Sequence, residues 1–160
     1  MGPDIYGHLT PTMNLMNSVI NNNLPFDPVF SINFVDVKDV AKGMMLAAQR
    51  GKPGSRYILA TEPSITTTDI IHMAKEIYPE TVVPTGMPKD QLLSIAEKME
   101  KESAITGQAP FLLVNNVEHY YGADARIDIS KARSELGYAP RDIKEVINDT
   151  FRYLKNKSNE

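Results

Sequence analysis

The stretch NFVDVKDVAKGMMLAA, residues 33–48, changes its hydrophobic period halfway along. Apolar side chains crowd residues 34–37 and then recur at Val40, Met44 and Ala47. The first pattern is typical of an extended segment, and the second has the spacing of an amphipathic helix. The stretch therefore predicts a strand or extended segment that runs directly into a helix, a junction common in α/β proteins.

Two acidic residues, Asp36 and Asp39, stand at this junction. A pair of carboxylates can perform acid–base chemistry. However, Asp is also a favoured N-cap, and an acid in the first turn complements the helix dipole. We therefore interpret Asp36 and Asp39 as helix-capping residues rather than as a catalytic pair.

The composition excludes several classes of protein. The 160 residues include 17 Lys and Arg against 20 Asp and Glu, and the basic residues do not cluster, so nothing predicts a nucleic-acid partner. No segment approaches the roughly 20 apolar residues of a membrane span, and no signal peptide is recognisable. Cysteine is absent, and the three histidines lack the spacing of metal ligands. We expect a cytoplasmic chain without a metal site or a membrane partner.

The rest of the sequence reads as mostly helical. Helical spacing or capping signals predict helices over 10–24, 38–50, 69–78, 89–103, 110–121, 130–136 and 141–155. Thr10 followed by Pro11 is expected to begin the first of these, a capping box from Thr66 to Asp69 the third, Pro110 the fifth and Ser130 the sixth. The last helix carries a predicted apolar stripe of Ile143, Val146, Ile147, Phe151 and Leu154. RYILAT, residues 56–61, predicts a strand buried on both faces, and VVPTG, residues 82–86, an edge strand. The predicted fold class is α/β, with three or four short strands among many helices.

Several motifs together resemble one known family. They are residues 33–70, the segment IDISKARSELGYAPR at 127–141, the pair Gly2–Pro3 and the element Thr106–Pro110. In their order along the chain they resemble the later half of extended short-chain dehydrogenases/reductases. That family includes NAD-dependent epimerases and dehydratases, and its dihydroflavonol-reductase-like members look nearest.

The resemblance implies that 1–160 is a single C-terminal, substrate-binding fragment of a Rossmann-type enzyme. Residues 36–61 would complete the cofactor sheet of the parent. The glycine-rich turn that holds the dinucleotide and the family's catalytic Tyr-x-x-x-Lys are both missing. Tyr153 and Lys157 do have that spacing, but they fall at the end of the last helix, where we interpret them as a surface pair. We therefore expect no catalytic residue and no cofactor in this chain, with NAD or NADP bound by the parent.

Related enzymes border their substrate cleft with the segments that match the region after Gly2–Pro3 and residues 32–34. The resemblance thus implies Tyr6, Ile32 and Phe34 as substrate-pocket residues, although core packing is an equal alternative for Phe34. Asn33 stands where nucleotide-sugar enzymes have an arginine, which disfavours a nucleotide-sugar ligand.

The function implied by the resemblance is that of the substrate-binding half of an NAD(P)-dependent carbonyl reductase, inactive alone. Its partner would be a small carbonyl compound. Two alternatives stay open: a fragment of a nucleotide-sugar epimerase or dehydratase, and a non-catalytic oligomerisation module. Because a lone buried strand leaves backbone groups unpaired, we also expect a homo-oligomer.

Overall fold

The computed structural model describes residues 9–123 and 126–157. In chain order these residues form α1 (Pro11–Ile20), β1 (Ser31–Ile32), α2 (Val37–Arg50), β2 (Ile65–Thr66), α3 (Thr67–Ile77), α4 (Lys89–Thr106), α5 (Val114–Tyr120), the π-helical turn η1 (Ala132–Leu136) and α6 (Ile143–Lys157). The two strands pair antiparallel, with Ser31 opposite Thr66. The predicted helical character is confirmed, but the described residues contain two regular strands instead of three or four.

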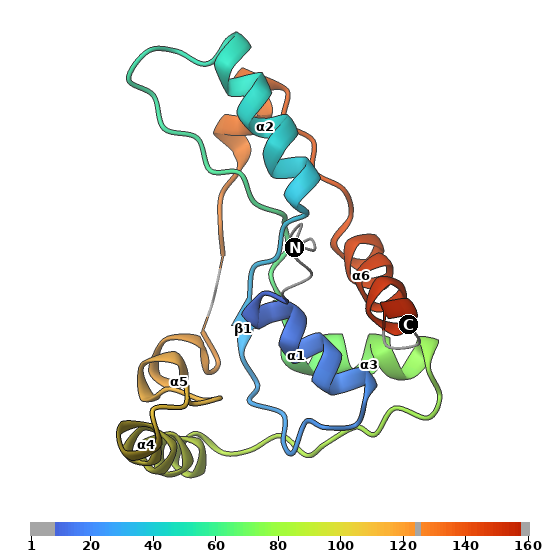
Figure 1. The fold of residues 1–160 in the computed structure, drawn as a ribbon. Coiled ribbons are helices and arrows are strands. Elements are labelled where there is room, and N and C mark those ends of the chain that lie inside the picture. The colour runs from blue at the N-terminus through green and yellow to red at the C-terminus, as the bar shows by residue number, and fades with distance from the viewer. Residues whose placement is uncertain (1–8, 124–125, 158–160) are drawn as a thin grey trace.

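The main hydrophobic core lies between α1, α3 and α6, which are far apart in sequence but pack on one another (Figure 1). Each helix contributes an apolar stripe, because residues three and four positions apart share a helix face. The stripe predicted for the last helix is confirmed: it is buried along its whole length, and its members are Ile143, Val146, Ile147, Phe151 and Leu154.

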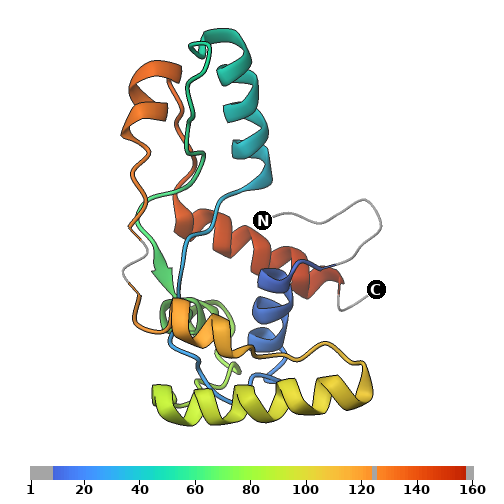
Figure 2. The same cartoon turned by 90° about the vertical axis from the view of Figure 1, so that its left-hand side faces the viewer.

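Two smaller clusters flank this core. In one, α4 packs against α5 around Leu92, Ala96 and Val117. In the other, α2 packs against η1 around Leu136 and Tyr138. Both ribbon views place α2 and η1 at the end of the molecule away from α4 (Figures 1 and 2).

Helix starts follow the local signals in the sequence. The Thr10 side chain accepts a hydrogen bond from the amide of Met13, and Pro11 occupies the first turn of α1. Thr66 and Asp69 form a reciprocal capping box at α3. These predictions succeed because a cap is made by residues within one turn of each other and needs no distant partner.

The strand predicted at residues 56–61 does not form. Leu59 packs against α2, since a Cβ atom added to Gly43 on that helix would lie 2.7 Å from the Leu59 side chain. Ile58, by contrast, is 53% exposed. A strand needs a neighbour to take its backbone hydrogen bonds, and none of the described residues pairs with this segment. The prediction of burial on both faces is therefore wrong for the chain as described.

Three further local features differ from the sequence predictions. Of residues 82–86, Gly86 alone makes an isolated bridge, to Asp27. Pro110 precedes its helix by several residues, since α5 begins at Val114. Ser130 already lies inside a helical turn, and the acid before it, Asp128, accepts the hydrogen bond from its amide at 2.8 Å. Bonds from Ser130 lower the pKa of the Asp128 carboxyl.

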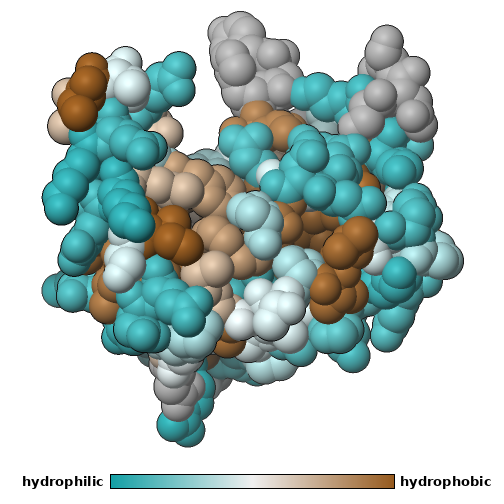
Figure 3. Space-filling model, turned by 90° about the horizontal axis from the view of Figure 1, so that it is seen from below, coloured by the Kyte–Doolittle hydropathy of each residue, from teal (hydrophilic) through white to brown (hydrophobic). Residues whose placement is uncertain are grey.

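The underside of the molecule mixes hydrophobic and hydrophilic side chains, and its middle is hollowed (Figure 3). The segment from α3 to α4 runs along this lower edge in Figure 1 and carries two exposed valines, Val82 and Val83. Isolated apolar residues of this kind are ordinary on a protein surface.

Burial predicts how two isoleucine truncations differ. Ile147 on α6 is fully buried, whereas Ile105 on α4 is 86% exposed. We expect Ile147→Ala to lower the free energy of unfolding by about 2–5 kcal/mol, because it removes packed methylenes and leaves a cavity. The matched control Ile105→Ala should change it by less than about 0.5 kcal/mol. Urea unfolding followed by circular dichroism measures both, and equal losses would contradict this description of the core.

Candidate functional site

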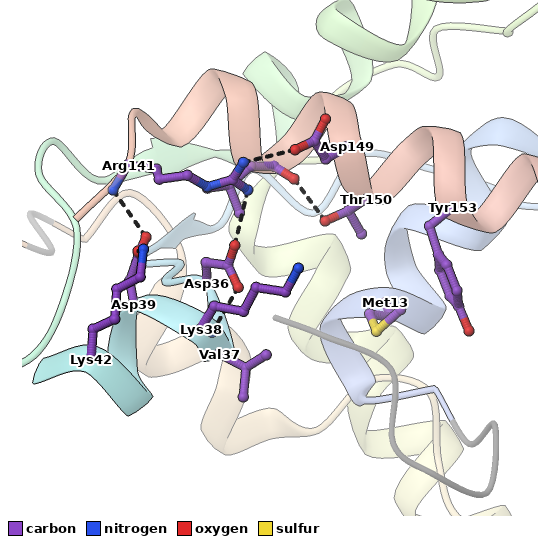
Figure 4. Close-up of a pocket in the computed structure, with 11 residues that line it drawn as sticks. Met13, Asp36, Val37, Lys38, Asp39, Lys42, Arg141, Asp149, Thr150 and Tyr153 are labelled. Atoms are coloured by element: carbon purple, nitrogen blue, oxygen red, sulfur yellow. Dashed lines mark hydrogen bonds and ion pairs between the residues drawn. The ribbon is translucent and has the colours of Figure 1, made fainter. Parts of the chain in front are cut away.

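Asp36 connects the start of α2 to the start of α6. It is the N-cap of α2, and its Oδ1 accepts a hydrogen bond from the amide of Lys38 at 2.9 Å. Its other oxygen accepts from the Arg141 guanidinium, also at 2.9 Å (Figure 4). The capping interpretation of Asp36 is confirmed, and the same carboxylate also binds a cation 105 positions along the chain.

Asp39 also binds Arg141, through the Arg141 backbone amide. Its side chain is 2% exposed, and Oδ2 accepts a hydrogen bond from the Arg141 amide at 2.9 Å. The Arg141 side chain also bonds to Asp149 at 2.9 Å, and the bonds to Asp149 and Asp36 raise the pKa of the guanidinium. We call Asp36, Asp39, Arg141 and Asp149 the ion-pair junction.

A cavity of about 400 Å³ adjoins this junction. Lys38, Lys42 and Tyr153 also line it (Figure 4). Because the acids of the junction are already bound to Arg141 or to backbone amides, their geometry indicates a structural role. Tyr153 packs partly against the main core.

The junction yields a stability prediction. Asp39→Ala leaves the Arg141 amide without its buried acceptor, so we expect a loss of about 1–3 kcal/mol in the free energy of unfolding. The matched control is Asp149→Ala, whose carboxylate is 52% exposed and screened by water, so we expect a loss below about 1 kcal/mol. Urea titrations of the two variants compare them directly, and an Asp39→Ala loss no larger than the control's would refute the junction's structural role.

A second cavity, of about 520 Å³, has the size of a small-molecule site. We call it the wall cavity, because one side is the extended segment 28–33. The first turns of α1 form another side, and α5 with the residues before it forms the third. Its lining residues are Pro11, Thr12, Leu15, Pro28, Phe30, Ser31, Ile32, Asn33, Phe111, Leu112, Asn116, Tyr120 and Ile127.

Nine of the thirteen lining residues are aliphatic, proline or aromatic, and the other four are neutral and polar. The rings of Phe30 and Tyr120 lie 6.0 Å apart, tilted by 50°, a favourable arrangement for an aromatic pair. The amide of Asn33 donates to the carbonyl of Thr61 at 2.5 Å, which fixes the orientation of the Asn33 side chain. Such a surface suits a flat, largely apolar ligand with a few hydroxyl or carbonyl groups.

The residues predicted from sequence fall in different places. Ile32, on β1, lines the wall cavity. Phe34 is 4% exposed and packs in the main core, where the alternative interpretation of core packing places it. Tyr6 lies outside the described residues, so its predicted role stays a prediction.

Sequence reasoning missed Phe30, Phe111, Asn116 and Tyr120. Their position around one cavity is not visible from spacing alone, because it depends on how α5 and the segment before it pack against residues 28–33. His119 is exposed and does not line this cavity; its ring nitrogen bonds to the carbonyl of Asn115 at 2.8 Å.

Comparison with known proteins shows which proteins this chain is similar to. It is 32% identical over 160 residues to a Synechocystis protein named "Putative dihydroflavonol 4-reductase", covering 92% of this chain and 43% of that protein. It superposes on the crystal structure of gox2253 with a TM-score of 0.72 and 27% identity, covering 98% of this chain and 46% of the other. The chain is homologous to the C-terminal part of dihydroflavonol-reductase-like extended short-chain dehydrogenases/reductases. No protein-family model matches it.

A third similarity extends the fold assignment. The yeast methylglyoxal/isovaleraldehyde reductase, solved with NADPH, shares the fold at a TM-score of 0.55 and 21% identity, covering 99% of this chain and 41% of the reductase. The chain thus spans less than half the length of the relatives it matches. The resemblance of the sequence to the later half of this family is confirmed.

The described residues contain no glycine-rich turn of the kind that holds a dinucleotide phosphate. Glycine-rich phosphate turns need several glycines together at the start of a helix. The glycines with positive φ here are Gly54, Gly107, Gly122 and Gly137, and they stand singly at turns and helix ends. Within the same residues no three His, Asp or Glu side chains gather as metal ligands, and no helix is long and apolar enough to cross a bilayer.

Proposed function

We propose that this chain forms the substrate-binding part of an NAD(P)-dependent carbonyl reductase. The observation that carries the proposal is the wall cavity, whose aromatic pair Phe30–Tyr120 and neutral polar lining suit a flat carbonyl compound. The name of the Synechocystis relative supports a dihydroflavonol-like substrate. Hydride transfer would need a dinucleotide and a proton donor held by residues outside this chain, so we expect no turnover from the chain alone.

A binding experiment tests this role without turnover. We expect a dihydroflavonol such as taxifolin to shift the methyl resonance of Ile32 in carbon-detected NMR spectra, because Ile32 lines the wall cavity. Tyr120→Ala should weaken binding about tenfold by removing the aromatic partner of Phe30. Tyr78→Ala, outside the cavity, is the matched control.

Two further ligands separate the alternatives. We expect NADPH to cause no saturable shift, since the described residues offer no phosphate turn. We expect UDP to bind more weakly than taxifolin, because Asn33 supplies no positive charge for a pyrophosphate. Saturable UDP binding at Ile32 with no response to taxifolin would favour the nucleotide-sugar alternative and contradict the proposal.

We further propose that residues 36–61 complete the cofactor sheet of a longer polypeptide. The backbone of residues 56–60 pairs with no described residue. Ile58 in this segment is 53% exposed, and Met44 and Met45 on α2 are each 63% exposed. An extended apolar segment with a free edge is a template for strand pairing. A cytoplasmic location, where NAD(P)H is available, belongs to the same proposal.

In the isolated chain this edge should drive self-association. We expect sedimentation velocity at tens of micromolar to show dimers or larger species, and Ile58→Lys to return the chain to a monomer by placing a charge on the edge. The matched control Ile105→Lys changes another exposed isoleucine and should leave the distribution as it is. A monomeric wild-type chain at these concentrations would contradict the expectation and disfavour the alternative of an oligomerisation module.

A further inference from the structure

Val29 has a backbone conformation that its side chain disfavours. Its φ is 53°, in the left-handed region that β-branched residues rarely adopt, because the Cβ crowds the following carbonyl. Both of its neighbours, Pro28 and Phe30, line the wall cavity. The strained residue therefore lies within the wall itself, and strain at such a position points to a functional constraint.

Asp27 holds this turn in place. The residue is 3% exposed, and its Oδ1 accepts hydrogen bonds from the Val29 amide at 2.9 Å and from the Thr67 hydroxyl. The second oxygen accepts from the Thr68 hydroxyl. These donors are neutral, and both threonines lie in the first turn of α3, where the helix dipole favours a negative charge.

The hydrogen bonds continue from Asp27 to the rest of the turn. Thr67 Oγ1 also accepts from the amide of Phe30 at 3.1 Å, and the Thr67 amide donates to the Phe30 carbonyl at 2.9 Å. The Asp27 main chain bonds to Thr85 and Met87 on its other side. Residues 27–30 are thus fixed by α3 and by the segment before α4, which can hold a strained residue in place.

Helix capping does not account for this arrangement. The N-terminus of α3 already has its own cap, the reciprocal pair Thr66 and Asp69. A turn needing only φ near 53° would be met without strain by glycine. The buried acid instead holds a bulky residue in the strained conformation beside Phe30.

We propose that Asp27, acting with Thr67 and Thr68, is a positioning residue. It holds Val29 in the left-handed conformation and thereby fixes Phe30 and Ile32 as the rigid side of the wall cavity. The inference rests on the proposed role of this cavity as the ligand site. Because glycine adopts this φ unaided, the need for Asp27 should disappear when Val29 is replaced by glycine.

The test combines a ligand-independent and a ligand-dependent measurement on the 160-residue chain. The first is the Ile32 methyl resonance together with the amide–Hα coupling at residue 29, which reports φ. The second is the affinity for taxifolin. The variants are Asp27→Ala, Asp27→Asn, the isosteric Thr68→Val, Val29→Gly and the double variant Asp27→Ala/Val29→Gly. Thr150→Val, which removes a hydroxyl bonded within α6, is the control.

We expect Asp27→Ala and Thr68→Val to shift the Ile32 methyl resonance and to weaken taxifolin binding, the former about tenfold. Asp27→Asn keeps an oxygen for the Val29 amide and should lose less than about threefold. The double variant should move the Ile32 resonance back toward its wild-type position and bind more tightly than Asp27→Ala, because glycine reaches the left-handed conformation without strain. Should Asp27→Ala not fold, Thr68→Val carries the same comparison against Thr150→Val.

Two results would overturn the inference: an unchanged Ile32 resonance and φ in both Asp27→Ala and Thr68→Val, or a double variant no better than Asp27→Ala. A wild-type chain that does not bind taxifolin would refute the proposed function instead. In that case the resonance and coupling still decide whether Asp27 positions the wall.

Discussion

The contact of Arg141 with Asp36 and Asp39 is the constraint on which the arrangement of the chain depends. Asp36 is the residue at which α2 begins, three positions after the wall segment 28–33, and Arg141 lies two residues before α6 begins. One residue therefore fixes both the direction in which α2 leaves the core and the position of the segment that returns from η1. The backbone amide of Arg141, held by a buried carboxylate, contributes more to this than its partly exposed guanidinium, because water screens exposed ion pairs.

The sequence predicts the features that one turn of chain determines. The Thr66–Asp69 capping box and the stripe from Ile143 to Leu154 each depend on residues three or four positions apart, so their spacing suffices. The family resemblance was carried by the motifs around Asp36 and Arg141. The structure shows why those two motifs go together, since their acids and base bind one another across the fold.

The wall cavity was predictable only in part. Ile32 and Phe34 are two residues apart, so in a continuous strand their side chains would lie on the same face. However, β1 ends at Ile32. Phe34 is buried in the main core, whereas Ile32 is only partly buried, packing against the same core and lining the cavity. The opposite side depends on where α5 packs against α4, which is a tertiary contact without a local signal. Residues 56–61 show the converse case, because their sequence fits a buried strand for which the described residues supply no neighbour.

The two sides of the wall cavity differ in how firmly they are held, and this difference bears on specificity. The segment from Asp27 to Asp36 is fixed at one end by the α3 threonines and at the other by Arg141. On the opposite side the backbone is held by the packing of α5 on α4 and by the bridge between Phe30 and Tyr121. However, the two aromatic side chains that this side contributes, Phe111 and Tyr120, are 52% and 46% exposed. A ligand of varying size would therefore be accommodated by rotation of these two side chains, while the wall keeps its position. Differences in substrate preference between related chains should accordingly depend on residues 111–120 more than on residues 28–33, because a strained, hydrogen-bonded segment tolerates few changes.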